Sequence, residues 1–119
     1  MTTRTSTLTL TLFLLGATTA LPALSQTKIP YGPDPMQYGE LTLPEGDGPF
    51  PVVTFLHAGC WMSTEGMINS YRAMAMAVAA QGIAAWNVQY RGATSEGGGW
   101  PGTWHDIANG FDALVDLAE

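Results

Sequence analysis

The amino-acid sequence predicts an α/β fold, in which strands and helices alternate along the chain. Residues 52–56 (VVTFL) form an almost unbroken apolar run rich in β-branched residues, which is typical of a strand buried on both faces. A segment with helical spacing follows, and a second apolar run occupies residues 83–90 (IAAWNVQY). A strand, a helix and a strand in this order form a βαβ unit, in which the two strands run parallel with a right-handed crossover.

The other elements follow from the spacing of apolar residues and from proline and glycine. Residues 26–35 form a proline-bearing, extended lead-in, and residues 38–43 alternate in polarity up to Pro44, which indicates a strand. The first helix is predicted to end near Gly82, which stands where a left-handed turn belongs. Its apolar positions are Ile68, Tyr71, Ala75, Val78 and Ala79.

A second helix is predicted from residue 103 to the end of the chain. Thr103, with Asp106 three residues later, resembles a capping box in which aspartate replaces the usual glutamate. An apolar stripe at helical spacing follows and should face the core. The stripe consists of Ile107, Phe111, Leu114, Val115 and Ala118.

The first 25 residues have the pattern of a secretory signal peptide. Residues 1–4 carry one positive charge, residues 8–17 are uncharged and rich in leucine, and Ala23 and Ser25 are the small residues that a signal peptidase reads. The apolar run is too short to span a bilayer. We expect cleavage before Gln26 and a secreted or periplasmic protein; the alternative is a buried first helix.

Charge and composition exclude several classes of partner. Removal of the signal would leave 94 of the 119 residues and change the net charge from −6 to −7, because Arg4 is lost. An acidic chain is a poor ligand for nucleic acids and anionic membranes, which need basic patches. The single cysteine, Cys60, excludes an internal disulfide. The two histidines and the acids lack metal-binding spacing, so neither a metal nor a cofactor is expected.

The loop after the 52–56 strand holds the candidate site and reads His57-Ala58-Gly59-Cys60-Trp61. In open α/β sheets, ligands bind outside the carboxyl ends of the strands. The small residues Ala58 and Gly59 let backbone N–H groups come close to a substrate oxygen. Two such donors can hold the negative charge that develops on a carbonyl oxygen during acyl transfer.

Residues 51–61 (PVVTFLHAGCW) resemble the third strand and oxyanion loop of α/β-hydrolases of the esterase and arylformamidase group, which carries His-Gly-Gly-x-Trp at this point. Residues 31–44, 79–92 and 97–107 resemble further segments of that group, in the same order. The resemblance implies the amino-terminal part of an α/β-hydrolase domain over residues 26–119, with a mostly parallel sheet and flanking helices. Ala58 departs from the group's glycine, so we expect a negative φ there.

The resemblance also implies a function, hydrolysis of a carboxylic ester or arylformamide through a serine acyl-enzyme. It assigns the oxyanion donors to the amides of Gly59 and Cys60, with Ala58 in reserve, and it places His57, Ala58 and Trp61 next to the substrate. The group's nucleophile, acid and histidine follow in that order, and this sequence holds no Gly-x-Ser-x-Gly. We therefore expect the triad beyond Glu119, an inactive isolated chain, and an open sheet edge that a second chain completes.

Three residues near the loop allow two interpretations. His57 is a general base or a structural histidine that fixes the loop; the structural role is favoured because the group's base lies elsewhere. Cys60 is a nucleophile or a small packing residue, and packing is favoured because only His57 is near enough to activate it. Arg91 pairs with a carboxylate at the rim of the site or in a structural salt bridge, and the salt bridge is favoured.

The tryptophans leave a similar choice. Trp61 lines the acyl pocket or packs under the loop, and the sequence does not decide between the two. Trp100 and Trp104 flank a glycine-rich loop and border a substrate cleft or pack against the fold, with packing favoured. Two other classes of protein remain: a binding module that kept the loop but lost catalysis, and a non-functional product of a truncated gene.

Overall fold

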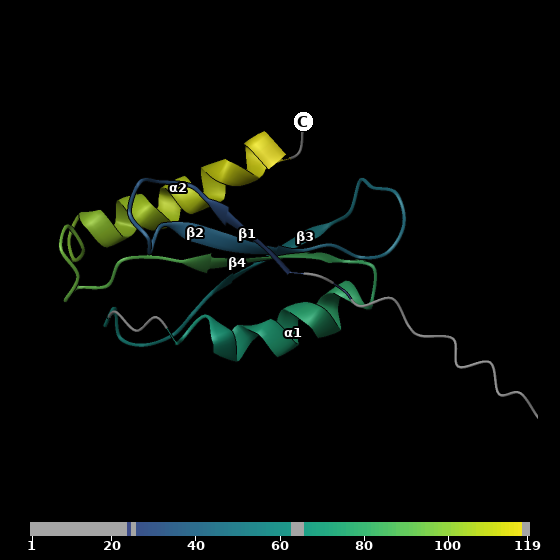
Figure 1. Cartoon of the computed structure of the whole chain (residues 1–119), viewed down its shortest axis with the longest axis horizontal. Helices are drawn as coiled ribbons and strands as arrows, with labels where there is room; N and C mark the ends of the chain where they lie inside the picture. Colours follow the sequence, from purple (N-terminus) through teal and green to yellow (C-terminus); the bar gives the residue numbers. More distant parts are fainter. Residues whose placement is uncertain (1–23, 25, 63–65, 118–119) are drawn as a thin grey trace, which may run out of the picture.

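A computed structural model describes residues 24, 26–62 and 66–117 (Figure 1). Apart from residue 24, the expected signal peptide lies outside the described residues. The elements are β1 (Gln26–Pro30), β2 (Tyr38–Thr42), β3 (Val52–Leu56), α1 (Asn69–Ala79), β4 (Ala84–Gln89) and α2 (Gly102–Leu117). β1 is a strand in the stretch that the sequence predicted only as an extended lead-in. The order of the other five elements agrees with the sequence prediction, and their boundaries move by one or two residues, as expected for frayed ends.

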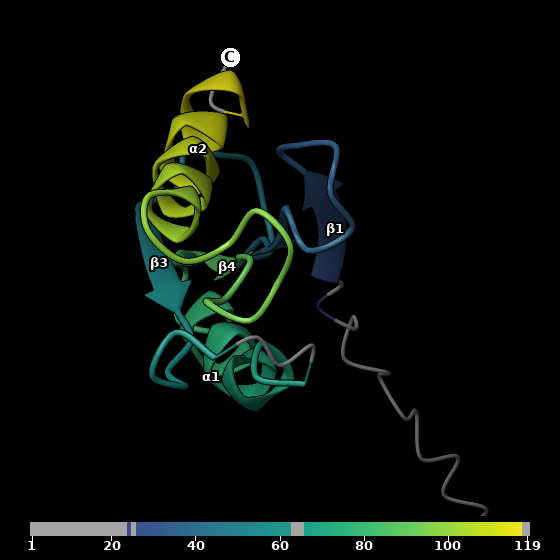
Figure 2. The ribbon, with the colours of Figure 1, turned by 90° about the vertical axis from the view of Figure 1, so that its left-hand side faces the viewer.

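The strands form one mixed sheet in the order β1-β2-β4-β3. The helices cover opposite faces of the sheet, α1 on one side and α2 on the other (Figures 1 and 2). β3 and β4 pair in parallel and α1 connects them, so the predicted βαβ unit and the α/β class are confirmed. The expected predominance of parallel pairing is wrong for these strands, because both β1–β2 and β2–β4 are antiparallel.

The core is centred on β4, in which all six residues are buried. Trp86 is fully buried and donates its indole N–H to the Gly110 carbonyl of α2 at 2.7 Å. The ring also lies against Gly39 of β2, where an added Cβ would stand 2.1 Å from the nearest ring atoms. Gly39 therefore makes room for the largest side chain of the core, and Gly110 makes room for Val88 and Tyr31.

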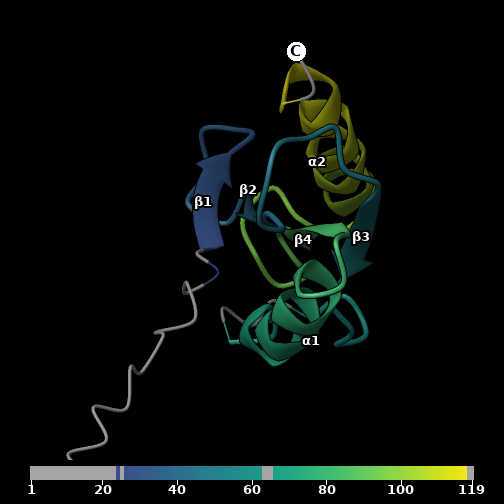
Figure 3. The same ribbon diagram turned by 90° about the vertical axis from the view of Figure 1, so that its right-hand side faces the viewer.

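β3 is less buried than its apolar run predicted, whereas its position at an edge of the sheet agrees with the open edge expected from the resemblance. It forms one edge of the sheet, opposite β1 (Figure 3), and its terminal residues Val52 and Leu56 are 51% and 39% exposed. The prediction of burial was wrong because an apolar run shows only that both faces of a strand are suited to burial. Among the described strands, β4 pairs with one side of β3 and none pairs with the other.

The second helix also differs from its prediction. Thr103 lies inside α2, and its hydroxyl donates to the Arg91 carbonyl at 2.6 Å and accepts from the Gly99 amide at 3.0 Å, so it makes no capping box with Asp106. The helix buries Thr103, Asp106 and Gly110 instead of the expected stripe. Phe111 and Val115 of that stripe are exposed, and Ala118 lies outside the described residues.

The first helix agrees better with its sequence. Gly82 has a φ of +83°, the left-handed conformation predicted for the end of α1. Of the described helices, none is long and apolar enough to traverse a bilayer.

The open edge of β3 should make the isolated chain associate. An edge strand offers unpaired N–H and C=O groups, and VVTFL carries no charge to repel a second strand. We expect residues 26–119 to elute above the monomer mass in size-exclusion chromatography with light scattering. Thr54→Lys places a charge at the centre of this edge and should raise the concentration of half-association about tenfold. Thr94→Lys, in an exposed loop, is the control. A monodisperse wild-type monomer would contradict the expectation.

Candidate functional site

The candidate site lies where β3 and β4 end. Because the two strands are parallel, their carboxyl ends meet at one edge of the sheet, and the loop of residues 57–61 lies there beside the segment that leaves β4. The Ala93 amide donates to the Trp61 carbonyl and joins the two segments. A cavity of about 470 Å³ opens at this point. It is lined by Leu56, His57, Ala58, Gly59, Cys60, Trp61, Tyr90, Trp104 and Ile107, and so by all five residues that the sequence proposed.

The backbone of this loop is held in an unusual conformation. Gly59 has a φ of +135°, which glycine adopts readily and other residues do not. Cys60 and Trp61 have φ values of +52° and +57°, in the left-handed region that carries a cost for residues with a Cβ. Ala58 is not among the residues with positive φ, as expected. The fold thus holds two consecutive residues in strained conformations at the mouth of a cavity, as is frequent at functional sites.

The amides of the loop divide into one that the fold uses and two that it leaves available. The Ala58 N–H donates to the Tyr71 hydroxyl of α1 at 3.2 Å, so the reserve oxyanion donor is already engaged. Among the residues that the structure describes, the Gly59 and Cys60 N–H groups have no acceptor, whereas the Gly59 carbonyl accepts from the Met62 amide at 2.8 Å. In the described part of the chain, these two amides are therefore the donors of residues 58–60 that the fold leaves without a partner.

His57 holds the loop in place through ring stacking and hydrogen bonds. Its side chain is buried and stacks on the Tyr90 ring, with the centroids 4.2 Å apart and the planes 3° from parallel. The Tyr90 hydroxyl donates to the His57 carbonyl at 2.6 Å, and burial raises the Tyr90 pKa, which keeps the donor protonated. Nδ1 of His57 lies 2.9 Å from the Ala58 carbonyl; because a carbonyl only accepts, Nδ1 carries the proton. These contacts agree with the structural interpretation of His57.

An ion pair between Arg91 and Asp106 anchors to α2 the segment that leaves β4, on the other side of the cavity. The Arg91 guanidinium donates to the Asp106 carboxylate from Nε at 2.8 Å and from Nη2 at 2.7 Å, and the Arg91 amide donates at 3.0 Å. Gln37 adds a fourth hydrogen bond to Asp106, at 2.6 Å. Arg91 therefore makes a structural salt bridge, as the sequence favoured.

Asp106 is fully buried, so its charge depends on these partners. Burial by itself would raise the pKa of the Asp106 carboxyl, but the hydrogen bonds from Arg91 and Gln37 outweigh it and bring the pKa below its ordinary value of 3.8. The side-chain hydrogen bond to Asp106 also raises the pKa of the Arg91 guanidinium. The sequence assigned Asp106 to a helix cap and did not single out Gln37. The available signal was a charged residue one turn before Gly110 on the face of α2 that meets the sheet.

Two tryptophans, Trp61 and Trp104, line the cavity, and Trp100 contacts Trp104. The Trp61 and Trp104 rings meet edge to face, with centroids 5.5 Å apart and planes at 87°, and Trp100 meets Trp104 at 6.2 Å and 74°. Trp61 is 53% exposed, so it does not pack under the loop, and Trp100 is 81% exposed, so the favoured packing role is wrong for it. We call these three residues the tryptophan cluster.

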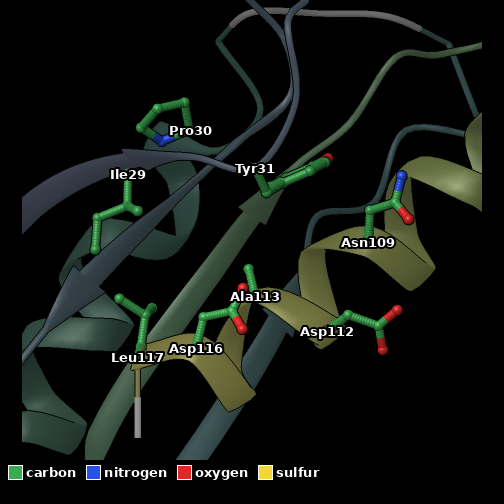
Figure 4. Close-up of a pocket in the computed structure, with 8 residues that line it drawn as sticks. All are labelled: Ile29, Pro30, Tyr31, Asn109, Asp112, Ala113, Asp116 and Leu117. Carbon is green, nitrogen blue, oxygen red and sulfur yellow. The ribbon is translucent and has the colours of Figure 1, made fainter. Parts of the chain in front are cut away.

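A larger cavity, of about 530 Å³, lies between the end of β1 and α2 (Figure 4). It contains none of the residues that the sequence proposed for the site. Two carboxylates, Asp112 and Asp116, border it together with Tyr31. Burial and the nearby Asp106 charge raise the pKa of Tyr31, and its hydroxyl donates to the Gln89 carbonyl, so Tyr31 remains a neutral structural group.

No protein-family model and no curated protein matches this chain. Within residues 24, 26–62 and 66–117, no group of three or more histidine, cysteine, aspartate or glutamate side chains is placed to hold a metal ion.

Proposed function

We propose that this chain is the amino-terminal part of an α/β-hydrolase that cleaves a carboxylic ester or an arylformamide. In this proposal the amides of Gly59 and Cys60 bind the oxygen of the tetrahedral intermediate. One observation carries the proposal: these two donors lack an acceptor among the described residues and border a cavity at the carboxyl edge of the β3–β4 pair. Donors that are held in place before the substrate arrives need no reorganisation during the reaction.

In this proposal the loop of residues 57–61 binds the oxyanion, and a serine and a histidine outside this sequence carry out the attack and the proton transfer. A serine hydroxyl attacks the substrate carbonyl carbon and passes its proton to a histidine, and the carbonyl π electrons move onto the oxygen. The Gly59 and Cys60 amides, with the amide after the serine, hold that oxyanion. Collapse of the intermediate expels the alcohol or amine, which takes the proton from the histidine. Water then hydrolyses the acyl-serine by the same steps.

Two features of the fold support this division. Tyr71 and Tyr90 hold the loop from α1 and β4, through the Ala58 amide and the His57 carbonyl, so the free amides sit on a fixed support. The open side of β3 is where a strand leading to the serine would pair, next to the oxyanion loop. The proposal therefore requires the nucleophile to come from a polypeptide that covers this edge.

The isolated chain tests the proposal. Residues 26–119 should not hydrolyse p-nitrophenyl acetate or butyrate above a no-protein blank, because the sequence holds no nucleophile elbow. The nucleotides that follow the codon for Glu119 should encode Gly-x-Ser-x-Gly in some frame. Turnover by the purified chain that survives removal of contaminating esterases would contradict the proposal, as would a downstream sequence without this motif in any frame.

A further inference from the structure

The tryptophan cluster surrounds a second, smaller cavity beside the oxyanion loop. Its volume is about 200 Å³, and it is lined by Trp61, Ala93, Gly99, Trp100, Thr103 and Trp104. None of these side chains is charged, and three of the six carry an indole ring. Pockets for whole drug-sized ligands measure about 300–1,000 Å³, so this cavity suits one compact group of a larger molecule.

The angles between the rings indicate which kind of group fits. Trp61 and Trp104 meet at 87°, and Trp100 and Trp104 at 74°, so the rings of Trp61 and Trp100 each stand at a steep angle to the ring of Trp104. A flat aromatic ligand that stacks on Trp104 cannot also stack on either of the other two rings. A compact cation can lie near several ring faces at once, and the negative faces of indole rings attract it.

The backbone segments that carry the three tryptophans are held in place by hydrogen bonds and close packing. Trp61 stands in a left-handed backbone conformation, and its carbonyl accepts from the Ala93 amide. On the opposite side of the cavity lies the loop of residues 90–101, between β4 and α2. The Thr103 hydroxyl is hydrogen-bonded to Gly99 and Arg91, and the Arg91–Asp106 ion pair anchors the start of this loop. The loop itself is closely packed, because a Cβ on Gly98 would stand 1.9 Å from the Gly92 carbonyl oxygen. The backbone of the site therefore needs little ordering on binding, and preorganisation favours affinity.

The charge of the molecule agrees with a cationic ligand. The chain carries 10 acidic and 4 basic side chains, and no basic residue lines the cavity. An acidic protein attracts cations and concentrates them at its surface. A quaternary ammonium also gives up its weak hydration more readily than a compact ammonium such as that of lysine, which suits an apolar cage.

We infer that the tryptophan cluster binds a quaternary ammonium group. Trp61 and Trp104 also line the cavity of about 470 Å³ that borders Gly59 and Cys60. A group held by the tryptophan cluster therefore lies beside the oxyanion loop. As a further step that rests on the proposed function, the substrate is an ester that carries a quaternary ammonium close to its carbonyl.

A matched pair of ligands tests the inference. Choline and 3,3-dimethylbutan-1-ol have the same shape and differ in the charge of the central atom. Each is titrated into the full chain, and the fluorescence of its tryptophans is followed; the fully buried Trp86 supplies a constant background. We expect saturable binding of choline, with a dissociation constant about fivefold or more below that of the neutral analogue.

Variants locate the binding site. Trp100→Leu removes the most exposed ring of the cluster with little effect on folding and should weaken choline binding about fivefold. Phe111→Leu removes an exposed aromatic ring of α2 outside the cage and should leave the binding unchanged. Equal affinity for choline and its neutral analogue, no saturable binding, or equal effects of the two variants would overturn the inference. The titration needs no nucleophile, so its failure is separate from a failure of the proposed hydrolysis.

Discussion

Asp106→Ala is expected to lower the free energy of unfolding by about 3–5 kcal/mol, the usual effect of breaking a buried ion pair. The carboxylate accepts three hydrogen bonds from Arg91 and one from Gln37, and its removal leaves these donors without their partner. Because small domains are stable by only about 5–15 kcal/mol, this loss is a large fraction of the total stability. Urea denaturation followed by circular dichroism measures the effect.

Asp112→Ala is the matched control, because Asp112 lies on the same helix and is exposed. It should change the stability by about 0.5 kcal/mol or less. Equal stability of the two variants would show that the Asp106 network does not support the fold.

The pH dependence of stability gives a second readout of the same network. The pKa of Asp106 is lower in the folded chain than its ordinary value of 3.8, so the folded state favours the charged form. The stability from this group is complete above a pH of about 4 and is lost as the pH falls through the folded pKa. Asp106→Asn, which cannot titrate, should flatten the acid limb of the stability curve below pH 4.

Gly59→Ala is expected to lower kcat about 10²–10³-fold in a polypeptide that continues beyond Glu119 to the nucleophile, with little change in KM. A φ of +135° is unfavourable for alanine, and the new Cβ would stand 3.2 Å from the Met67 side chain. The loop must move, and it displaces both free amides. Steady-state hydrolysis of p-nitrophenyl butyrate measures kcat and KM.

Cys60→Ala separates the backbone amide from the thiol at the next position. It keeps the amide of residue 60 and removes the sulfur, so it should change kcat by no more than about threefold. A loss of activity as large as that of Gly59→Ala would instead assign the chemistry to the thiol. An unchanged kcat in Gly59→Ala would remove the loop from the mechanism.

The sequence predicted the positions of the helices and strands along the chain better than it predicted which of their residues are buried. Periodicity located β4 and α1, because a buried apolar run and a helical repeat are local signals. The open edge at β3 was expected from the family resemblance and not from the apolar run, because VVTFL is compatible with either an edge or a central position. The buried face of α2 was also missed. Gly110 accepts the Trp86 indole at close range, so a small residue meets the sheet while Phe111 faces outward.

The same distinction applies to the candidate site. The position of the 57–61 loop followed from the rule that ligands bind at the carboxyl ends of strands, and the five proposed residues border one cavity. The engagement of Ala58 by Tyr71 and the convergence of Trp61 with Trp100 and Trp104 join residues that are 13 to 43 positions apart. Such contacts arise from tertiary packing, which no local pattern in the sequence records.

The central claim is that the Gly59 and Cys60 amides hold an oxyanion. A crystal structure of the continued polypeptide, after reaction with a fluorophosphonate ester, tests it most directly, because the phosphonyl oxygen occupies the position of the oxyanion. We predict a phosphonylated serine whose phosphonyl oxygen lies about 2.7–3.1 Å from both amide nitrogens. A phosphonyl oxygen bound by other donors, with both loop amides out of hydrogen-bonding range, would contradict the claim.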